Sequence, residues 1–133
     1  MLPENFSPQR PLTYLALPYS HPDPAVRCAR FVDANIAAAK LLKQGHLVYS
    51  PISHTHPIAA QENLELDWSA WESLNATYLA LSHTLIVLTL DGWRDSVGLA
   101  AEIKLAKLLH LNVRFLPPEF LTDDLNYPAR PNP

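Results

Sequence analysis

The string Ser96-x-Gly98-x-x-x-Glu102 places a hydroxyl, a glycine and a carboxylate at the start of an expected helix. The first N–H groups of a helix have no partner within it, so they form a ready site for an anion or a sugar hydroxyl. Glu102 follows about one and a half turns later and would face the same hollow. The plainer interpretation is that Ser96 only caps the helix, Gly98 only allows close packing, and the acid only borders a buried face.

The position of Glu102 on this helix favours a chemical role. At about 100° per residue, Glu102 shares a strip with Gly98 and Leu105. Lys104 and Lys107 lie on nearly the opposite side. That is an unusual place for a solvated acid, so we expect a poorly hydrated carboxylate.

The histidines invite a metal interpretation, because imidazole is a common zinc ligand. His54 and His56 stand two residues apart in the segment 51–57, with His21 and His46 elsewhere. We nevertheless expect no metal, because no cysteine or acid cluster completes a ligand set. In an extended loop the pair also lacks the geometry of a helical pair. Hydrogen bonding to a substrate, or bracing of the loop, is the favoured role of His54 and His56.

An aromatic stripe follows on the helix expected over 67–82. Trp68, Trp71, Asn75 and Tyr78 fall on one face at helical spacing. Aromatic stripes usually belong to a core or an interface. The amide of Asn75 must find partners if it is buried, and aromatic faces beside an amide suit a nucleobase.

Composition limits the class of protein. The chain has 133 residues, enough for one domain with a single core. Hydrophobic residues make up 48% and charged residues only 17%, which predicts that a second subunit covers part of the surface, as in a homo-oligomer of two or more chains. A net charge of −3 without a basic run argues against binding of a nucleic-acid duplex but leaves small nucleotides possible.

The N-terminal sequence and the cysteine count indicate a compartment. Cys28 is the single cysteine, so no intrachain disulfide can form and a reducing compartment is the simpler assumption. The first residues lack the pattern of a signal peptide, and no apolar run approaches the ~20 residues of a membrane span. We expect a cytoplasmic protein that does not engage a membrane.

Strands and helices should alternate along the chain. The patterns predict strands at 12–17, 46–50, 84–90 and 112–116, and helices at 25–44, 67–82 and 96–110. This alternation is typical of an α/β, flavodoxin-like or Rossmann-like three-layer sandwich with a small parallel sheet of about four or five strands. We expect an irregular arm over 1–11, a single domain over 12–116, and a proline-rich tail over 117–133.

Three loops should converge at one edge of the sheet, because ligands of open parallel sheets bind beyond the carboxyl ends of the strands. These loops span 18–24, 51–57 and 91–96. They supply the substrate-binding candidates Tyr19, Ser20, His21, His54, His56, Asp91 and Trp93. The phosphate-binding glycine patterns of ATPases and dehydrogenases and the nucleophile elbow of hydrolases do not occur.

Two motifs together resemble a known family. They are Tyr14-Leu15-Ala16-Leu17-Pro18-Tyr19 on the first strand and Ser96-Val97-Gly98 with Glu102 on the last helix. In this combination the chain resembles the nucleoside 2-deoxyribosyltransferase superfamily, in particular its DUF1937 branch. The resemblance spans roughly residues 12–116 and includes the loops 19–22, 50–58 and 90–96 in order.

The resemblance implies cleavage of an N-glycosidic bond without a metal or organic cofactor. Glu102 would attack the anomeric carbon of a ribose or deoxyribose, and Tyr14 would orient it. Ser96 and Gly98 would hold the 5′-hydroxyl or phosphate. A carboxylate near C1′ stabilises the oxocarbenium-like transition state and can trap it as a glycosyl-enzyme, after which water gives hydrolysis and a second base gives transfer.

One departure from the family pattern matters. Relatives carry an aspartate that binds or protonates the base where this chain has Asn75, and an amide cannot be a general acid. Either Asp91 or a histidine of the 54–56 loop protonates the base, or the protein binds nucleotides, for example as a sensor, without efficient turnover. A third possibility is a scaffold that binds no nucleotide. Leu17 also replaces a small residue and should narrow the pocket.

Overall fold

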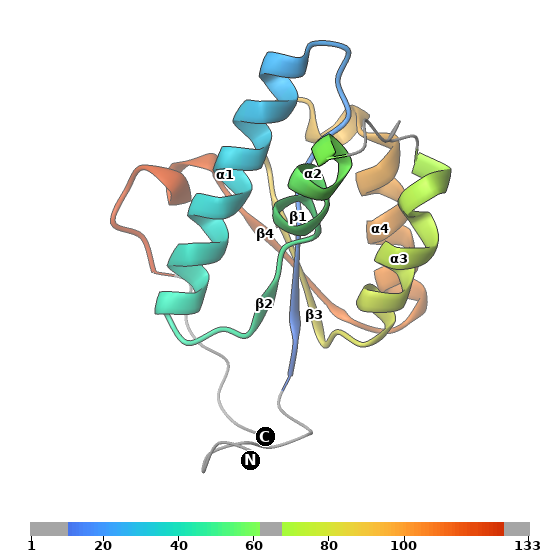
Figure 1. The fold of residues 1–133 in the computed structure, drawn as a ribbon. Helices are drawn as coiled ribbons and strands as arrows, with labels where there is room; N and C mark the ends of the chain where they lie inside the picture. Colours follow the sequence, from blue (N-terminus) through green and yellow to red (C-terminus); the bar gives the residue numbers. More distant parts are fainter. Residues whose placement is uncertain (1–10, 62–67, 127–133) are drawn as a thin grey trace, which may run out of the picture.

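Four parallel strands form the sheet of the part of the chain that the computed structural model describes (Figure 1). That part comprises residues 11–61 and 68–126, with side chains from residue 71 onward in the second range. The strands are β1 (Thr13–Ala16), β2 (Val48–Tyr49), β3 (Thr84–Leu88) and β4 (Asn112–Leu116), in the order β2-β1-β3-β4. All three pairings are parallel. The predicted small parallel sheet is confirmed.

Helices cover both faces of this sheet. The helix α1 (Pro24–Lys43) and the 3₁₀ turn η2 (Pro118–Leu121) lie on one face, and α3 (Trp68–Ala80) and α4 (Val97–Leu108) lie on the other (Figure 1). Helix α2 (Pro51–Gln61) follows β2 and packs against α1 and β1. The three-layer, Rossmann-like or flavodoxin-like sandwich is therefore the observed architecture.

Strand alternation divides the core into two clusters. On β1, Leu15 points to the α1 face and Tyr14 to the α3 and α4 face, because successive side chains of a strand point to opposite sides. Leu15, Ile86 and Leu41 belong to the first cluster, and Tyr14 and Leu99 belong to the second. Both faces of the central strands are thus buried, as their continuous apolar runs predict.

The start of α1 has the expected cap. The Asp23 carboxylate accepts a hydrogen bond of 2.9 Å from the backbone N–H of Ala25, and Pro24 occupies the first turn. The helix ends just before Gly45, whose φ of 94° favours glycine. Of the other predicted elements, the strand 112–116 has the predicted bounds, and the strand 46–50 shrinks to two residues.

The prediction of a loop over 51–57 is wrong, because these residues begin α2. Two prolines suggested a loop, but Pro51 lies in the first turn, where a missing N–H removes no helical bond. Pro57 does remove one bond from the helix interior. Burial of Ile52, Thr55 and Ala59 at helical spacing offsets this loss, and the Thr55 hydroxyl donates to the Pro51 carbonyl at 2.8 Å.

Part of the predicted tail belongs to the folded core. Phe120 in η2 is completely buried among the side chains of the α1 face. The Lys40 ammonium donates to the backbone carbonyls of Phe120 and, at 2.7 Å, Asp123, and lies 4.6 Å from the Phe120 ring centroid. The described chain therefore stays attached to α1 beyond β4.

Some predictions fall outside the described residues. These are the arm over 1–10, the end of the tail over 127–133 and the start of the 67–82 helix. Across residues 11–61 and 68–126, no helix combines the length and the apolar character that crossing a bilayer requires.

Candidate active site

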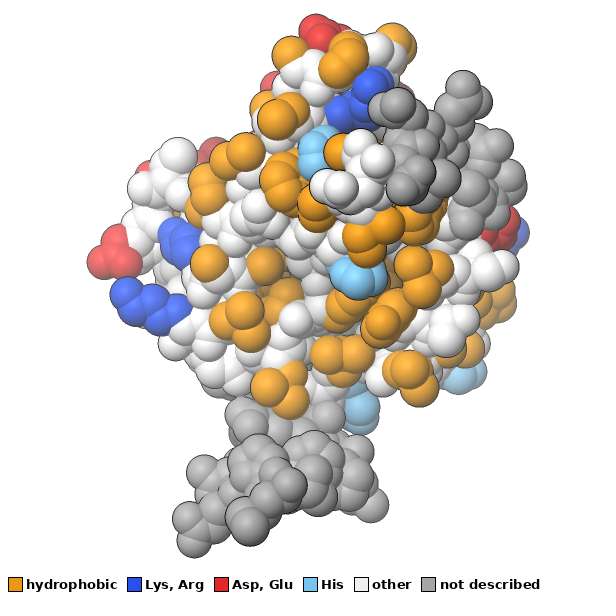
Figure 2. Space-filling view, in the orientation of Figure 1, with side chains coloured by type: hydrophobic (Ala, Val, Ile, Leu, Met, Phe, Trp, Pro, Cys, Tyr) orange, Lys and Arg blue, Asp and Glu red, His pale blue; other side chains and the backbone are white. Residues whose placement is uncertain are grey.

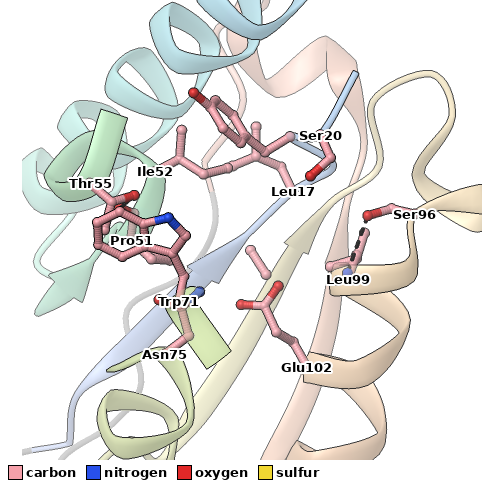
Figure 3. Close-up of a pocket in the computed structure, with 13 residues that line it drawn as sticks. Leu17, Ser20, Pro51, Ile52, Thr55, Trp71, Asn75, Ser96, Leu99 and Glu102 are labelled. Carbon is pink, nitrogen blue, oxygen red and sulfur yellow. Dashed lines mark hydrogen bonds between the residues drawn. The ribbon is translucent and has the colours of Figure 1, made fainter. Parts of the chain in front are cut away.

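A pocket, partly open to solvent, lies at the carboxyl ends of β1 and β3, where the strand order reverses (Figure 3). This is the edge at which open parallel sheets bind ligands. Its lining comes from the β1 loop and from α2, α3 and α4: Ala16, Leu17, Tyr19, Ser20, Pro51, Ile52, Thr55, Trp71, Asn75, Ser96, Gly98, Leu99 and Glu102.

Glu102 is the carboxylate of this pocket, and it is only 8% exposed. The hydroxyl of Tyr14, fully buried on β1, donates a hydrogen bond to Glu102 Oε2. Burial raises the pKa of Glu102 to about 7, and the Tyr14 hydrogen bond opposes this shift. The pKa of Tyr14 is raised by burial and by the neighbouring carboxylate, so Tyr14 remains a donor.

No cationic side chain compensates this carboxylate among the described pocket-lining residues, none of which is lysine or arginine. Tyr14 supplies its polar contact instead. An isolated buried carboxylate is unfavourable, and this explains why its pKa rises. The pocket is therefore complementary to a ligand or a transition state that carries positive charge.

The start of α4 forms one wall of the pocket. Ser96 caps this helix, since its Oγ accepts a hydrogen bond of 3.2 Å from the Leu99 N–H. Ser96, Gly98 and Leu99 all line the pocket. The capping bond leaves the hydroxyl hydrogen of Ser96 free to donate to a ligand, and Gly98 presents no side chain that would fill the space.

The opposite wall comes from α3. Trp71 and Asn75, one helical turn apart, lie across the cavity from Glu102 (Figure 3). Within the described part of the chain, the buried Trp71 Nε1 and Asn75 Oδ1 atoms have no hydrogen-bond partner. Tyr78 of the predicted stripe stacks on Tyr49 at 3.9 Å and does not line the pocket. The Trp68 side chain lies outside the described residues.

The two histidines of α2 point to different neighbours, as residues two apart on a helix do. His56 stacks on Phe31 at 4.3 Å, and its Nδ1 lies 2.5 Å from the Tyr19 hydroxyl. Burial and the positive charge of Arg27 lower the pKa of His56. His54 is exposed beside the Tyr49 ring at 6.0 Å. Neither histidine lines the pocket, and His56 instead supports its Tyr19 wall.

Sequence reasoning missed Arg30, which joins two loops beside the pocket. From α1, its guanidinium donates to the carbonyls of Ser20 at 3.1 Å, Tyr19 at 3.3 Å and Asp91 at 3.1 Å. Gly92 takes a left-handed φ of 84° there, and an added Cβ would lie 3.3 Å from the Arg30 Nη2 atom. Glycine suits such a turn, but nothing in the sequence linked Gly92 to Arg30.

A comparison with protein families decides what the chain is related to. The family model described as "Domain of unknown function (DUF1937)" matches residues 11–116. The chain belongs to the DUF1937 family. The match spans the whole lining of the pocket, from Ala16 to Glu102. A search of the curated proteins finds no match.

Three other predicted site residues lie outside the pocket of this DUF1937 domain. Asp91 is exposed and contributes its carbonyl to Arg30. Trp93 packs against Phe115 with ring centroids 5.6 Å apart. His21 Nδ1 accepts a hydrogen bond of 3.0 Å from the Asp23 N–H.

The described part of the DUF1937 domain holds no group of three or more histidine, cysteine or acidic side chains placed to bind a metal. The predicted site residues that do meet in or beside the pocket are Tyr14, Tyr19, Ser20, Trp71, Asn75, Ser96, Gly98 and Glu102.

Proposed function

We propose that this protein cleaves the N-glycosidic bond of a nucleoside or nucleoside 5′-monophosphate with Glu102 as the nucleophile. The observation that carries the proposal is the buried Glu102 carboxylate, held by Tyr14 in a pocket at the carboxyl ends of the central strands. The resemblance to nucleoside 2-deoxyribosyltransferases supports the same reaction.

In this proposal the second carboxylate oxygen of Glu102 attacks C1′ of the sugar while Tyr14 holds Oε2. The bond from C1′ to the base breaks, and its electron pair leaves with the base. Water then attacks C1′ of the glycosyl ester and gives the free sugar, or a second base takes its place and gives transfer. Excess positive charge on the sugar in each transition state is stabilised by the carboxylate.

The α4 wall suits the 5′ end of the substrate. The Ser96 hydroxyl and the first N–H groups of α4 would bind a 5′-hydroxyl or a phosphate, because helix N-termini favour negative charge and accepting groups. The α3 wall, with Trp71 and Asn75, would then hold the base on the other side of Glu102.

The test measures, by chromatography, the release of free base from a panel of nucleosides and nucleoside 5′-monophosphates. We expect Glu102→Gln to lower the rate by at least about a thousandfold, because a neutral amide is no nucleophile. Glu119→Gln, an exposed glutamate of η2, is the matched control and should keep the wild-type rate. An unchanged rate in Glu102→Gln would remove Glu102 from the mechanism.

A second candidate function is binding or sensing of a nucleotide without turnover. It is favoured by Asn75, because Glu102 is the only carboxyl among the described residues that line the pocket. Calorimetric titration that finds nucleotide binding, with no free base after long incubation, would favour this function over the enzyme. If no nucleotide raises the melting temperature, only the scaffold interpretation would remain.

We also propose a homo-oligomer in a reducing, cytoplasmic setting. Leu81, Val97 and Leu108 are 70%, 76% and 67% exposed. Hydrophobic side chains also lie at many places on the face shown in Figure 2, and a second copy could cover part of this apolar surface. Cys28 is an exposed free cysteine, which is compatible with the proposed reducing compartment. Light scattering that gives the mass of a single chain would refute the oligomer.

A further inference from the structure

We propose that the pocket is built for cationic N-glycosides of a pyridinium carboxamide rather than for neutral nucleosides, an inference that rests on the proposed N-glycosidic cleavage. Three features of the described pocket lining carry it: the lack of a free general acid, the Glu102 carboxylate without a lysine or arginine beside it, and two α3 polar atoms without a partner.

The first feature concerns the leaving base. A neutral nucleobase leaves with an electron pair and needs a proton from a general acid. Of the pocket-lining side chains in the described ranges, only Glu102 and Tyr19 titrate. Glu102 is occupied as the nucleophile, and the Tyr19 hydroxyl is engaged by His56, while burial raises its pKa. A pyridinium leaving group departs as a neutral pyridine and needs no proton.

The second feature is charge. Glu102 is buried, accepts a hydrogen bond from Tyr14 and has no lysine or arginine beside it in the described pocket lining. A cationic substrate would supply the missing opposite charge and would favour the ionised carboxylate that the attack requires. A neutral substrate would leave that charge unpaired until the transition state.

The third feature is the pair of unpartnered atoms on α3. Trp71 Nε1 is a hydrogen-bond donor and Asn75 Oδ1 is an acceptor, and neither has a partner among the described residues. Buried polar groups in folded proteins are almost always paired, so this wall would be stabilised by a ligand that pairs with both atoms. A primary carboxamide could form a hydrogen bond with each atom, because its carbonyl accepts from an indole N–H and its NH₂ donates to an amide oxygen.

The reaction step balances without a further reactant. The Glu102 carboxylate forms an ester with C1′, the bond from C1′ to the ring nitrogen breaks, and its electron pair converts the pyridinium into a neutral pyridine carboxamide. Water then attacks C1′, the ester bond breaks, and the carboxyl group releases one proton to solvent.

The experiment compares release of nicotinamide from nicotinamide riboside and its 5′-monophosphate with release of adenine or uracil from the matched neutral compounds. We expect kcat/KM to favour the pyridinium substrates by at least about a hundredfold, the usual contribution of a general acid that the neutral substrates lack here. Release of adenine or uracil without nicotinamide would overturn this inference and leave the proposed function standing. No base release from any compound would overturn both.

Trp71→Phe tests the carboxamide contact separately. It removes the indole N–H and keeps an aromatic ring, so KM for nicotinamide riboside should rise about three- to tenfold. KM for N-ribosylpyridinium, which lacks the carboxamide, should stay unchanged, and a melting curve would verify the fold. An equal rise for both substrates, or for neither, would contradict recognition of the carboxamide.

Discussion

The two helices that face each other across the pocket treat their polar groups differently. On α4, Glu102 accepts from Tyr14, and Ser96 accepts from the Leu99 N–H. On α3, Trp71 Nε1 and Asn75 Oδ1 have no partner in the described part of the chain. The polar groups of the α4 wall are thus already held by the protein, whereas the α3 wall keeps two polar atoms that a ligand could pair.

The largest expected effect concerns the charge on the α4 wall. The pKa of Glu102 rises from an ordinary value of 4.5 to about 7 on folding. The folded state therefore binds this proton more tightly than the unfolded state, so Glu102 favours folding below pH 4.5 and this contribution is lost as the pH rises through 7. The stability of Glu102→Gln relative to the wild type should therefore depend on pH. Between pH 4 and pH 8, we expect the difference in free energy of unfolding to shift by about 3 kcal/mol in favour of the variant.

Urea unfolding of both proteins at pH 4, 6 and 8 measures this difference. If the proposed reaction is correct, wild-type kcat/KM should also fall about tenfold per pH unit below 7, because the attack needs an ionised Glu102. A difference in stability that does not change with pH would contradict a buried, high-pKa carboxyl.

The next effect breaks the contact between β1 and α4. Tyr14→Phe removes the donor to Glu102, and hydrogen bonds to charged groups contribute about 1.5–3 kcal/mol, so the rate should fall about 10- to 150-fold. The pH at which activity is half-maximal should also rise, because the Tyr14 bond lowers the pKa of Glu102.

Tyr49→Phe is the matched control for that change. The Tyr49 hydroxyl is buried and has no partner among the described residues, and burial raises its pKa to about 12. Its removal should leave the pH profile nearly unchanged and should not lower stability, because an unpartnered buried oxygen is lost. Equal effects of the two tyrosine substitutions would contradict a specific role of Tyr14.

A smaller effect of opposite sign is expected on the α3 wall. Asn75→Leu removes an unpartnered buried amide oxygen, so the free energy of unfolding should rise by about 1 kcal/mol while ligand affinity falls. Ser82→Ala, just beyond α3, should instead lower stability, because the Ser82 hydroxyl donates to the Tyr78 carbonyl at 2.8 Å. Thermal melts with and without ligand measure both. A loss of stability in Asn75→Leu would mean that the amide is structural.

The smallest effect concerns the cap of α4. Ser96→Ala should lower the free energy of unfolding by about 1 kcal/mol, and Ser96→Thr, which keeps a capping oxygen, should lower it less. Chemical denaturation compares the two. If both variants match the wild type, the cap does not stabilise the start of α4.

Local patterns were sufficient for much of the fold. The apolar run at 84–90 predicted β3 because a strand buried on both faces is continuously apolar, and Ser96 predicted the start of α4 because its side chain caps its own helix. The two prolines at 51–57 led to the wrong prediction of a loop. Proline is common in loops, but it is also compatible with the first turn of a helix.

The candidate site was predictable only in part. The strip on α4 indicated that Glu102 would be poorly hydrated, and its burial confirms this. The support of Tyr19 by His56 and the bridge from Arg30 to Asp91 join residues 37 and 61 positions apart, and only the packed structure brings them together. His56 also lies outside the pocket lining, against Tyr19, because residues 51–57 form a helix. The expectation of an extended loop could not predict this orientation.

The burial of Phe120 has a practical consequence for how the chain is shortened. The family match ends at residue 116, which suggests a natural cutting point, yet Phe120 fills space beside Leu41 and Leu116. A chain truncated there would expose an apolar hollow along α1 and deprive the Lys40 ammonium of both carbonyl acceptors. Expression of the minimal folded unit should therefore extend through Asp123.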